Sequence, residues 1–108
     1  ILIQRDIIVN TWEKLVAASV VGYINSVISK MSSDPTQSIY HAWAEMRAFA
    51  MALQYNTFSE ASLTSAITSL GIAPPQPADY ATYTTTLESI KNTLKTEYNF
   101  SDTNMSAW

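Results

Sequence analysis

The sequence lacks cysteine altogether and has little glycine, proline or charge. Without cysteine the chain cannot form a disulfide, a thiolate metal site, a c-type haem attachment or a cysteine nucleophile. The two glycines stand alone, so there is no glycine-rich phosphate loop. Six basic residues against nine acidic ones leave no basic stripe, which argues against nucleic-acid binding.

What remains is an apolar, uncharged composition. Of 108 residues, 47% are apolar and only 14% are charged, where about 25% is usual. This is too apolar for a disordered segment, and the length suffices for one modest core. Ser, Thr, Asn and Gln supply about a third of the chain in place of charge. Such a surface is common among exported proteins, which favours an extracytoplasmic location in the cell envelope.

Apolar residues recur at three- and four-residue steps along four segments, which predicts an all-α, up-and-down helical bundle. The first segment has an apolar belt wider than one stripe, which is typical of a central bundle helix. Polar residues between Lys14 and Lys30 interrupt that belt, so a membrane span is not expected. The predicted helices cover residues 1–31, 35–55, 59–70 and 79–98.

Capping residues mark the predicted ends of these helices. Asp34, or Ser33, is expected to cap the second helix with Pro35 at its first position. Ser59 is expected to cap the third helix, and Gly71 to take the left-handed conformation after it. The tail after Asn99 can hold one further turn, capped by Ser101 or Asp102.

The second helix carries the candidate site, because its few ionisable residues include His41 and Glu45, four positions apart on one face. An imidazole and a carboxylate so placed can share a divalent metal or iron, or act as an acid and its orienting partner. The alternative is a purely structural pair. A metal would need further ligands, such as Glu13. Arg47 is expected to pair with an acidic neighbour. The aromatic residues at helical spacing are expected in the core, namely Trp12, Tyr23, Trp43, Phe49, Tyr80, Tyr83 and Tyr98.

The segment from His41 to Phe49, continued by Leu53 to Asn56, resembles a family of uncharacterised all-helical lipoproteins of Bacteroidota-type cell envelopes. The ending from Tyr98 to Trp108 is similar to the close of the same domain. More distantly, the chain resembles imelysin-like proteins, whose signature is Gly-x-His-x-x-Glu. Here Ile39 replaces the glycine, and the glutamate follows four residues after His41. The resemblance implies an extracytoplasmic helical bundle and metal or ligand binding, with no established reaction.

From these observations we expect a non-enzymatic envelope protein with a metal ion or small ligand at His41 and Glu45. The alternative is a structural or accessory subunit whose first helix packs against a partner chain. A hydrolase is a further class, although no complete zinc-peptidase motif is visible. Because the chain opens inside an apolar run at Ile1, we expect a longer helical domain of which this is the C-terminal part. The partner is then another chain or that upstream part, and any membrane anchor lies upstream as well.

Overall fold

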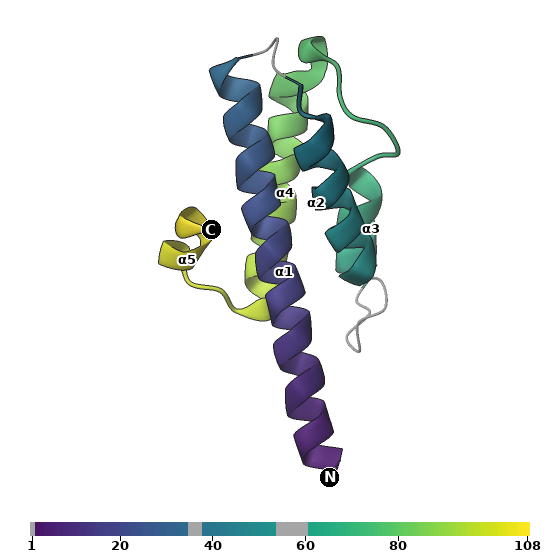
Figure 1. Ribbon diagram of the computed structural model, residues 1–108, viewed down its shortest axis with the longest axis vertical. Helices are drawn as coiled ribbons and strands as arrows, with labels where there is room; N and C mark the ends of the chain where they lie inside the picture. Colours follow the sequence, from purple (N-terminus) through teal and green to yellow (C-terminus); the bar gives the residue numbers. More distant parts are fainter. Residues whose placement is uncertain (1, 35–37, 54–60) are drawn as a thin grey trace.

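A computed structural model describes residues 2–34, 38–53 and 61–108, and no strand occurs in these ranges. The all-α bundle predicted from the sequence is therefore confirmed. Figure 1 shows the helices lying roughly along one long axis, with a short C-terminal helix beside α1. The helical elements are α1 (Leu2–Ser33), α2 (Tyr40–Ala52), α3 (Ala61–Ser69), the 3₁₀ turn η2 (Pro77–Asp79), α4 (Tyr80–Tyr98) and α5 (Asp102–Ala107).

Helix α1 is the longest helix of the described chain, and α2 and α4 pack against it. Its 32 residues span about 48 Å at 1.5 Å per residue, nearly the full 51 Å length of the fold. Helices α2 and α4 both pack along its C-terminal half (Figure 1). That half supplies the largest share of the core, with Val16, Ala17, Val20, Val21, Ile24, Val27 and Met31 buried.

The stripes predicted for the third and fourth helices are confirmed. On α4, Leu87, Ile90, Leu94 and Tyr98 are buried, and Tyr80 and Tyr83 pack against the same core. Helix α3 contributes Leu63 and Ile67 to the core, and Leu70, just after the helix, is buried with them. These residues face inward because they step by three and four, which keeps them on one side of each helix.

Two predicted helix-terminal residues are also confirmed, Gly71 and Ser101. Gly71 follows α3 with a φ of +80°, a left-handed conformation that favours glycine. Ser101 caps α5, because its hydroxyl accepts a hydrogen bond of 3.1 Å from the Asn104 amide. The predicted Ser59 cap and the ends of the second and third helices at 54–55 and 59–60 lie outside the described residues.

The predicted start of the second helix at Pro35 is wrong: α2 begins at Tyr40, after Ile39. The turn residues that were expected to begin it belong instead to the end of α1. Ser32 and Ser33 donate their hydroxyls to carbonyls three residues back, and the Asp34 amide bonds the Lys30 carbonyl at 3.3 Å. Because such back-bonding also satisfies a serine hydroxyl inside a helix, a serine near a helix end does not by itself mark the start of the next helix.

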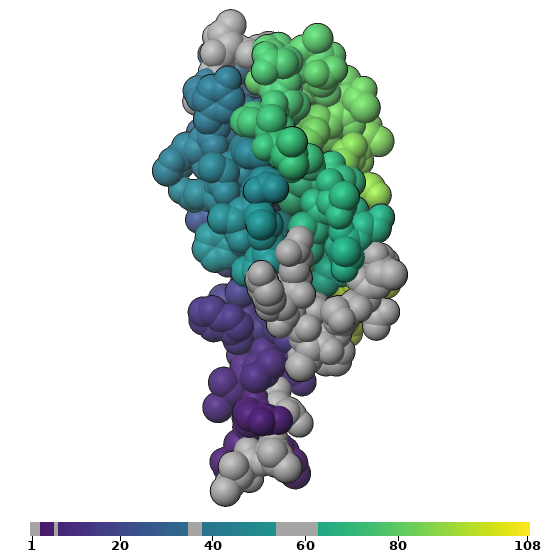
Figure 2. Space-filling model, turned by 90° about the vertical axis from the view of Figure 1, so that its right-hand side faces the viewer, coloured from purple at the N-terminus to yellow at the C-terminus, as the bar shows by residue number. Residues whose placement is uncertain are grey.

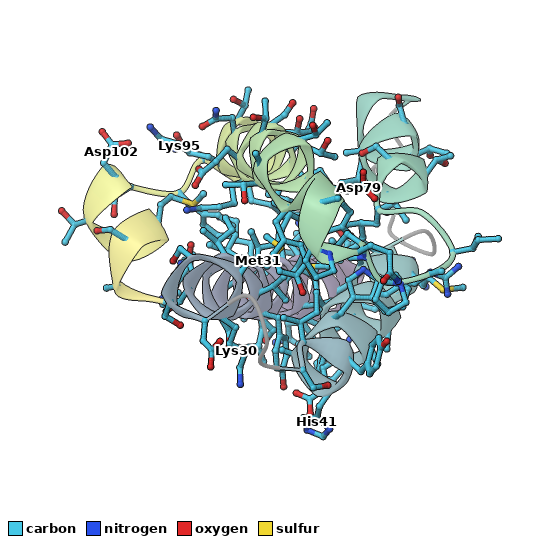
Figure 3. The ribbon with its side chains drawn as sticks, turned by 90° about the horizontal axis from the view of Figure 1, so that it is seen from above. Lys30, Met31, His41, Asp79, Lys95 and Asp102 are labelled. Carbon is cyan, nitrogen blue, oxygen red and sulfur yellow. The ribbon has the colours of Figure 1, made fainter. Side chains whose placement is uncertain are left out.

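The C-terminal residues are fixed on the middle of α1. The Asn25 side-chain amide donates to the carbonyls of Met105 and Trp108, both at 3.0 Å. Trp108 lies over Gly22, at an ordinary contact distance of 3.7 Å from the position that a Cβ atom would take there. An ion pair between Lys95 and Asp102 joins α4 to α5 (Figure 3). Helix α5 therefore covers one side of α1.

Length and composition would also let residues Ile3–Ser33 cross a membrane. This property is shared by core helices of soluble proteins and by signal sequences. In the structure α1 is the central helix of the bundle, as its wide apolar belt predicted.

Candidate functional site

The two candidate site residues of the sequence meet on the outside of α2. The His41 Nε2 atom contacts the Glu45 Oε1 atom across one helical turn. The His41 side chain is 92% exposed and that of Glu45 is 34% exposed. Figure 3 shows His41 at the outer rim of the bundle, pointing away from the core. The predicted pairing is present, and it lies on the surface rather than in a cleft.

Glu45 also binds Tyr23 of α1, and this contact ties the two helices together. A hydrogen bond to the Glu45 carboxylate, followed by burial and by the nearby negative charge, raises the pKa of the Tyr23 phenol. The Tyr23 ring stacks on Phe49 of α2 with 5.3 Å between centroids. One carboxylate thus joins an imidazole on its own helix to a phenol on the neighbouring helix.

A metal ion at His41 and Glu45 would need ligands that these two residues do not supply. Among the described residues no group of three or more His, Asp or Glu side chains lies close enough to hold one. Glu13, the expected further ligand, lies beside Ala52 and Leu53 at the other end of α2. Ala52 is eleven residues from His41, or about 16 Å along the helix, so Glu13 cannot join the pair.

Within residues 2–34, 38–53 and 61–108, Arg47 forms no ion pair with an acidic side chain of the kind predicted. Its Nε atom donates to the Gly71 carbonyl at 3.0 Å, and its Nη1 atom contacts the Met51 sulfur at 3.1 Å. Gly71 lies in the turn two residues after Ser69, the last residue of α3. The guanidinium therefore ties this turn to α2, a structural role.

The N-terminal half of α1 is the most unusual surface of the described chain. It extends beyond the ends of the other helices (Figure 1) and stands clear of the bundle in Figure 2. We call residues 3–15 the arm. Its large apolar side chains are 60% to 76% exposed, namely Ile3, Ile7, Ile8, Trp12 and Leu15. The prediction that Trp12 lies in the core is therefore wrong.

The cause is the length of the neighbouring helices. The 13 residues of α2 cover about 20 Å and the 19 residues of α4 about 28 Å, whereas α1 covers about 48 Å. The arm therefore extends past the ends of the helices that would otherwise bury its apolar side chains. Helical spacing in the sequence reports which side chains share a face, but not whether another helix reaches that face. The signal available was the mismatch between the 31 residues expected for the first helix and the shorter helices that follow it.

A shallow cavity of about 320 Å³ lies where the arm meets the end of α2. Ile8, Trp12 and Val16 form one wall, and Ala52 and Leu53 form another. Glu13 lies against this cavity with only 6% of its surface exposed. The base of the arm is therefore an apolar hollow with a buried carboxyl group in its lining.

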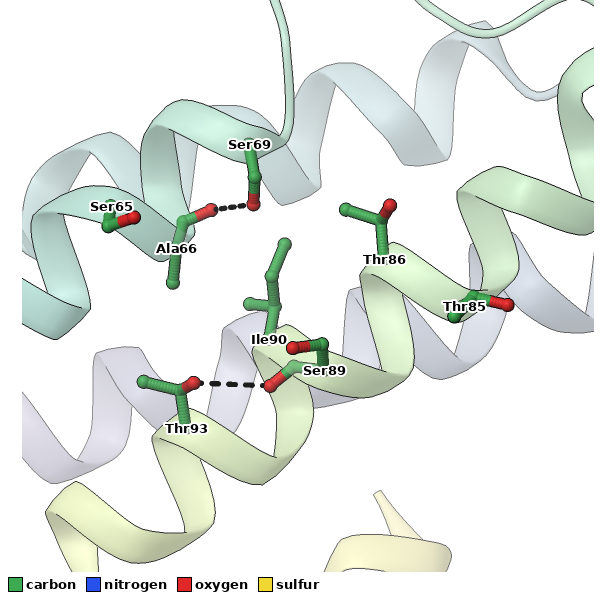
Figure 4. A pocket seen from close by; sticks show the side chains of 8 residues that line it. All are labelled: Ser65, Ala66, Ser69, Thr85, Thr86, Ser89, Ile90 and Thr93. Atoms are coloured by element: carbon green, nitrogen blue, oxygen red, sulfur yellow. Dashed lines mark hydrogen bonds between the residues drawn. The ribbon is translucent and has the colours of Figure 1, made fainter.

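A second hollow, of about 540 Å³, runs between α3 and α4 (Figure 4). We call it the hydroxyl groove, because it is lined by hydroxyl-bearing residues with Ala66 and Ile90 between them, and by no charged side chain. The hydroxyl residues are Ser65, Ser69, Thr85, Thr86, Ser89 and Thr93. Four of its six hydroxyl groups donate within their own helices; for example, Ser69 donates to the Ala66 carbonyl at 2.6 Å and Thr93 to the Ser89 carbonyl at 3.1 Å.

The structure thus offers three surfaces with distinct chemistry: an exposed histidine–glutamate pair, an apolar arm and an uncharged groove. The pair lies on the outer rim of α2 and lines neither of the two cavities just described. The groove was not predicted from the sequence, and the arm was anticipated only as part of a first helix that packs against a partner chain. Comparisons of the chain with protein-family models, with curated proteins and with solved structures find no match.

Proposed function

We propose that this chain is a non-enzymatic accessory or assembly subunit that docks on a partner protein through the arm. One observation carries the proposal: five large apolar side chains, including a tryptophan, are 60% to 76% exposed along one helix. Contiguous exposed apolar surface on a folded protein marks an interaction site, and tryptophan is enriched at the centre of such sites.

A protein partner fits the arm better than a lipid bilayer does. The arm carries Arg5, Asn10 and Lys14, so it is not apolar all round. A net charge of −3 disfavours adsorption to anionic lipid headgroups. A protein interface accommodates such a helix, because an apolar centre with a polar rim is its ordinary composition.

The proposed location is the cell envelope, outside the cytoplasm. The support is compositional: uncharged Ser, Thr, Asn and Gln take the place that Lys and Glu occupy on most cytosolic helices. The resemblance of the His41–Phe49 segment to envelope lipoproteins points the same way. In this setting the Glu45 bridge to His41 and Tyr23 serves to hold α2 on α1.

The proposal is tested in cells that produce the protein. An epitope-tagged wild-type chain is expected to elute in a complex well above its own 12.0 kDa. The double variant Ile8→Ser with Trp12→Ser is expected to elute alone, with unchanged helical circular dichroism. The matched control is Ile72→Ser, which removes an apolar side chain that is 90% exposed but lies outside the arm. Equal elution of wild type and arm variant would contradict the proposal.

A second candidate function is binding of a divalent metal ion, zinc or iron(II), at His41 and Glu45. The observation that favours it is the contact between an imidazole nitrogen and a carboxylate oxygen, with the imidazole open to solvent. Calorimetric titration of Zn²⁺ into chelator-treated protein is expected to give binding heat that His41→Ala abolishes and Glu88→Ala preserves. Absence of heat in the wild-type titration removes this candidate.

A further inference from the structure

The arm and the hydroxyl groove are both uncovered in the described chain, and each has what the other lacks. The arm offers large apolar side chains and the groove is lined mainly by small ones. We propose that the partner of the arm is a second copy of this chain, whose hydroxyl groove receives the arm antiparallel to α4. This inference rests on the proposed function, because it names the partner that the arm docks on.

The lengths of the two surfaces agree. From Ile3 to Leu15 the arm spans about 18 Å. Along α4, the hydroxyl groove continues into a neighbouring hollow of about 340 Å³ through the shared residues Ser89 and Thr93. The joined surface runs from Thr85 to Glu97, which is again about 18 Å.

When apolar side chains cover the groove, few of its hydroxyl groups are left without a hydrogen-bond acceptor. The hydroxyls of Thr85, Thr86 and Thr93 already donate to carbonyls four residues back on α4. On α3, Ser69 donates to the carbonyl three residues back. A polar group costs free energy on burial chiefly when its hydrogen bond is lost, and these bonds remain. What such a hydroxyl residue then presents outward is its methyl or methylene group and an oxygen lone pair.

The charges beside the two surfaces are complementary. Arg5 and Lys14 lie nine residues apart on the arm, and Glu88 and Glu97 lie nine residues apart on α4. In the antiparallel register that sets Trp12 opposite Ile90, Arg5 falls opposite Glu97 and Lys14 opposite Glu88.

The helical repeat places the two members of each pair on the same flank of the contact. Glu88 contacts Lys91 at 3.6 Å and is half exposed, so it can accept a second cation. A parallel register that keeps both charge pairs would set Trp12 opposite Lys95 instead. The antiparallel arrangement is therefore favoured.

The contact joins two different surfaces, so each copy keeps one of each kind available. Such a heterologous contact builds an open chain unless its rotation closes a ring. In Figure 1 α1 and α4 run in opposite directions, so a copy docked antiparallel to α4 points the same way as its neighbour. The apolar surface of the arm is about 400 Å², which places the interface at the small end of specific ones. Association is accordingly weak and depends on concentration.

The test follows the mass of purified protein by light scattering and sedimentation over about a hundredfold range of concentration. Wild type is expected to grow past the dimer as concentration rises. Trp12→Asp, which spoils the arm, and Ser89→Arg, which blocks the groove, are each expected to stay at 12.0 kDa. Thr103→Arg on α5 adds the same charge away from both surfaces and is expected to associate like wild type. Circular dichroism establishes that every variant is folded.

Mixing the two defective variants gives the sharpest result. Ser89→Arg retains an arm and Trp12→Asp retains a groove, so together they form one contact and then stop. A discrete heterodimer is expected, and it supports the pairing of arm with groove. Lys14→Glu is expected to weaken wild-type association about tenfold, and Glu88→Lys added to it to restore the affinity, which supports the antiparallel register.

Three outcomes overturn the inference, and they differ from failure of the proposed function. A wild-type monomer at every concentration rules out the second copy as partner. Association that Trp12→Asp abolishes and Ser89→Arg leaves intact rules out the groove. Association unaffected by Trp12→Asp rules out the arm. In each case, arm-dependent elution of a complex from cells still decides separately whether the chain is an accessory subunit.

Discussion

The two halves of α1 have similar apolar content and opposite surroundings. From Val16 to Met31 the helix is enclosed by α2, α4 and α5, and its apolar side chains form the centre of the core. In the arm the corresponding side chains face outward. The difference comes from the lengths of the neighbours rather than from the residues of α1. A continuous helix can therefore stabilise a bundle with one half and recruit a partner with the other.

The largest expected effect separates the two halves directly. Ile24→Ala empties a fully buried site and is expected to lower the free energy of unfolding by about 2–5 kcal/mol. Ile8→Ala, the same change in the arm at a side chain that is 68% exposed, is expected to stay within about 0.5 kcal/mol of wild type. Urea denaturation of dilute protein measures both. Equal losses would show that the arm is packed in solution.

Tryptophan gives a second matched pair. The Trp43 indole donates to the Tyr83 hydroxyl at 2.7 Å, and that hydroxyl donates to the Leu70 carbonyl at 2.9 Å. Trp43→Phe removes one bond of this chain and leaves a gap, for an expected loss of about 2 kcal/mol. Trp12→Phe is expected to change stability by less than about 0.5 kcal/mol. The same denaturation experiment detects the difference, and a reversed order would contradict the assignment of core and arm.

The two glycines are expected to respond with opposite sign. Gly71→Ala places a side chain at a φ of +80° and is expected to cost about 1 kcal/mol. At Gly22, inside α1, an added Cβ atom would lie 3.7 Å from the Trp108 carbonyl carbon, an ordinary contact. Gly22→Ala is therefore expected to stabilise the helix by up to about 1 kcal/mol. Thermal unfolding of the two variants checks the signs, and a loss at Gly22 would mean that α5 packs more tightly on α1 than described.

The smallest expected effect is a pH dependence confined to the bundle, since the arm contains no tyrosine. Burial raises the pKa of Tyr83, although its hydrogen bond with Trp43 opposes part of that shift. Because the folded-state pKa is higher than the unfolded one, the stabilisation is complete below pH 10 and is lost as pH rises through the folded value.

Wild type is therefore expected to lose stability above pH 10 more steeply than Tyr83→Phe. Denaturation at a series of alkaline pH values measures the two slopes, with ultraviolet absorbance reporting tyrosine ionisation. Parallel slopes would mean that the Tyr83 phenol ionises with its ordinary pKa.

Much of the fold could be predicted from the sequence because its signals are local. The stripe on α4, the turn at Gly71 and the cap at Ser101 each depend on residues within a few positions of one another. The start of α2 could not be located, because Ser33 and Asp34 can serve either the helix that ends or the one that begins. In the structure Ile39 is buried immediately before α2, and this burial is a property of the whole packed chain.

The residues of the candidate site also fall into two groups, those whose positions follow from local spacing and those whose positions depend on contacts between helices. The contact of His41 with Glu45 was predictable from four-residue spacing on a helix. The placement of Glu13 at the far end of α2, and of Arg47 on the Gly71 carbonyl, depends on contacts between helices. The exposure of Trp12 depends on where two other helices end. No pattern within residues 1–31 contains that information.

The three tryptophans of the chain occupy three different settings, and this gives the protein a built-in optical readout. Trp43 is enclosed in the core, Trp12 stands on the arm, and Trp108 meets the Phe100 ring edge-on at 4.8 Å. Indole emission moves to shorter wavelength as water is removed from around the ring. Chains that keep a single tryptophan therefore emit separately from the bundle interior, the protruding helix and the tail. Docking of the arm would be seen as a blue shift of Trp12 alone, without any added dye or label.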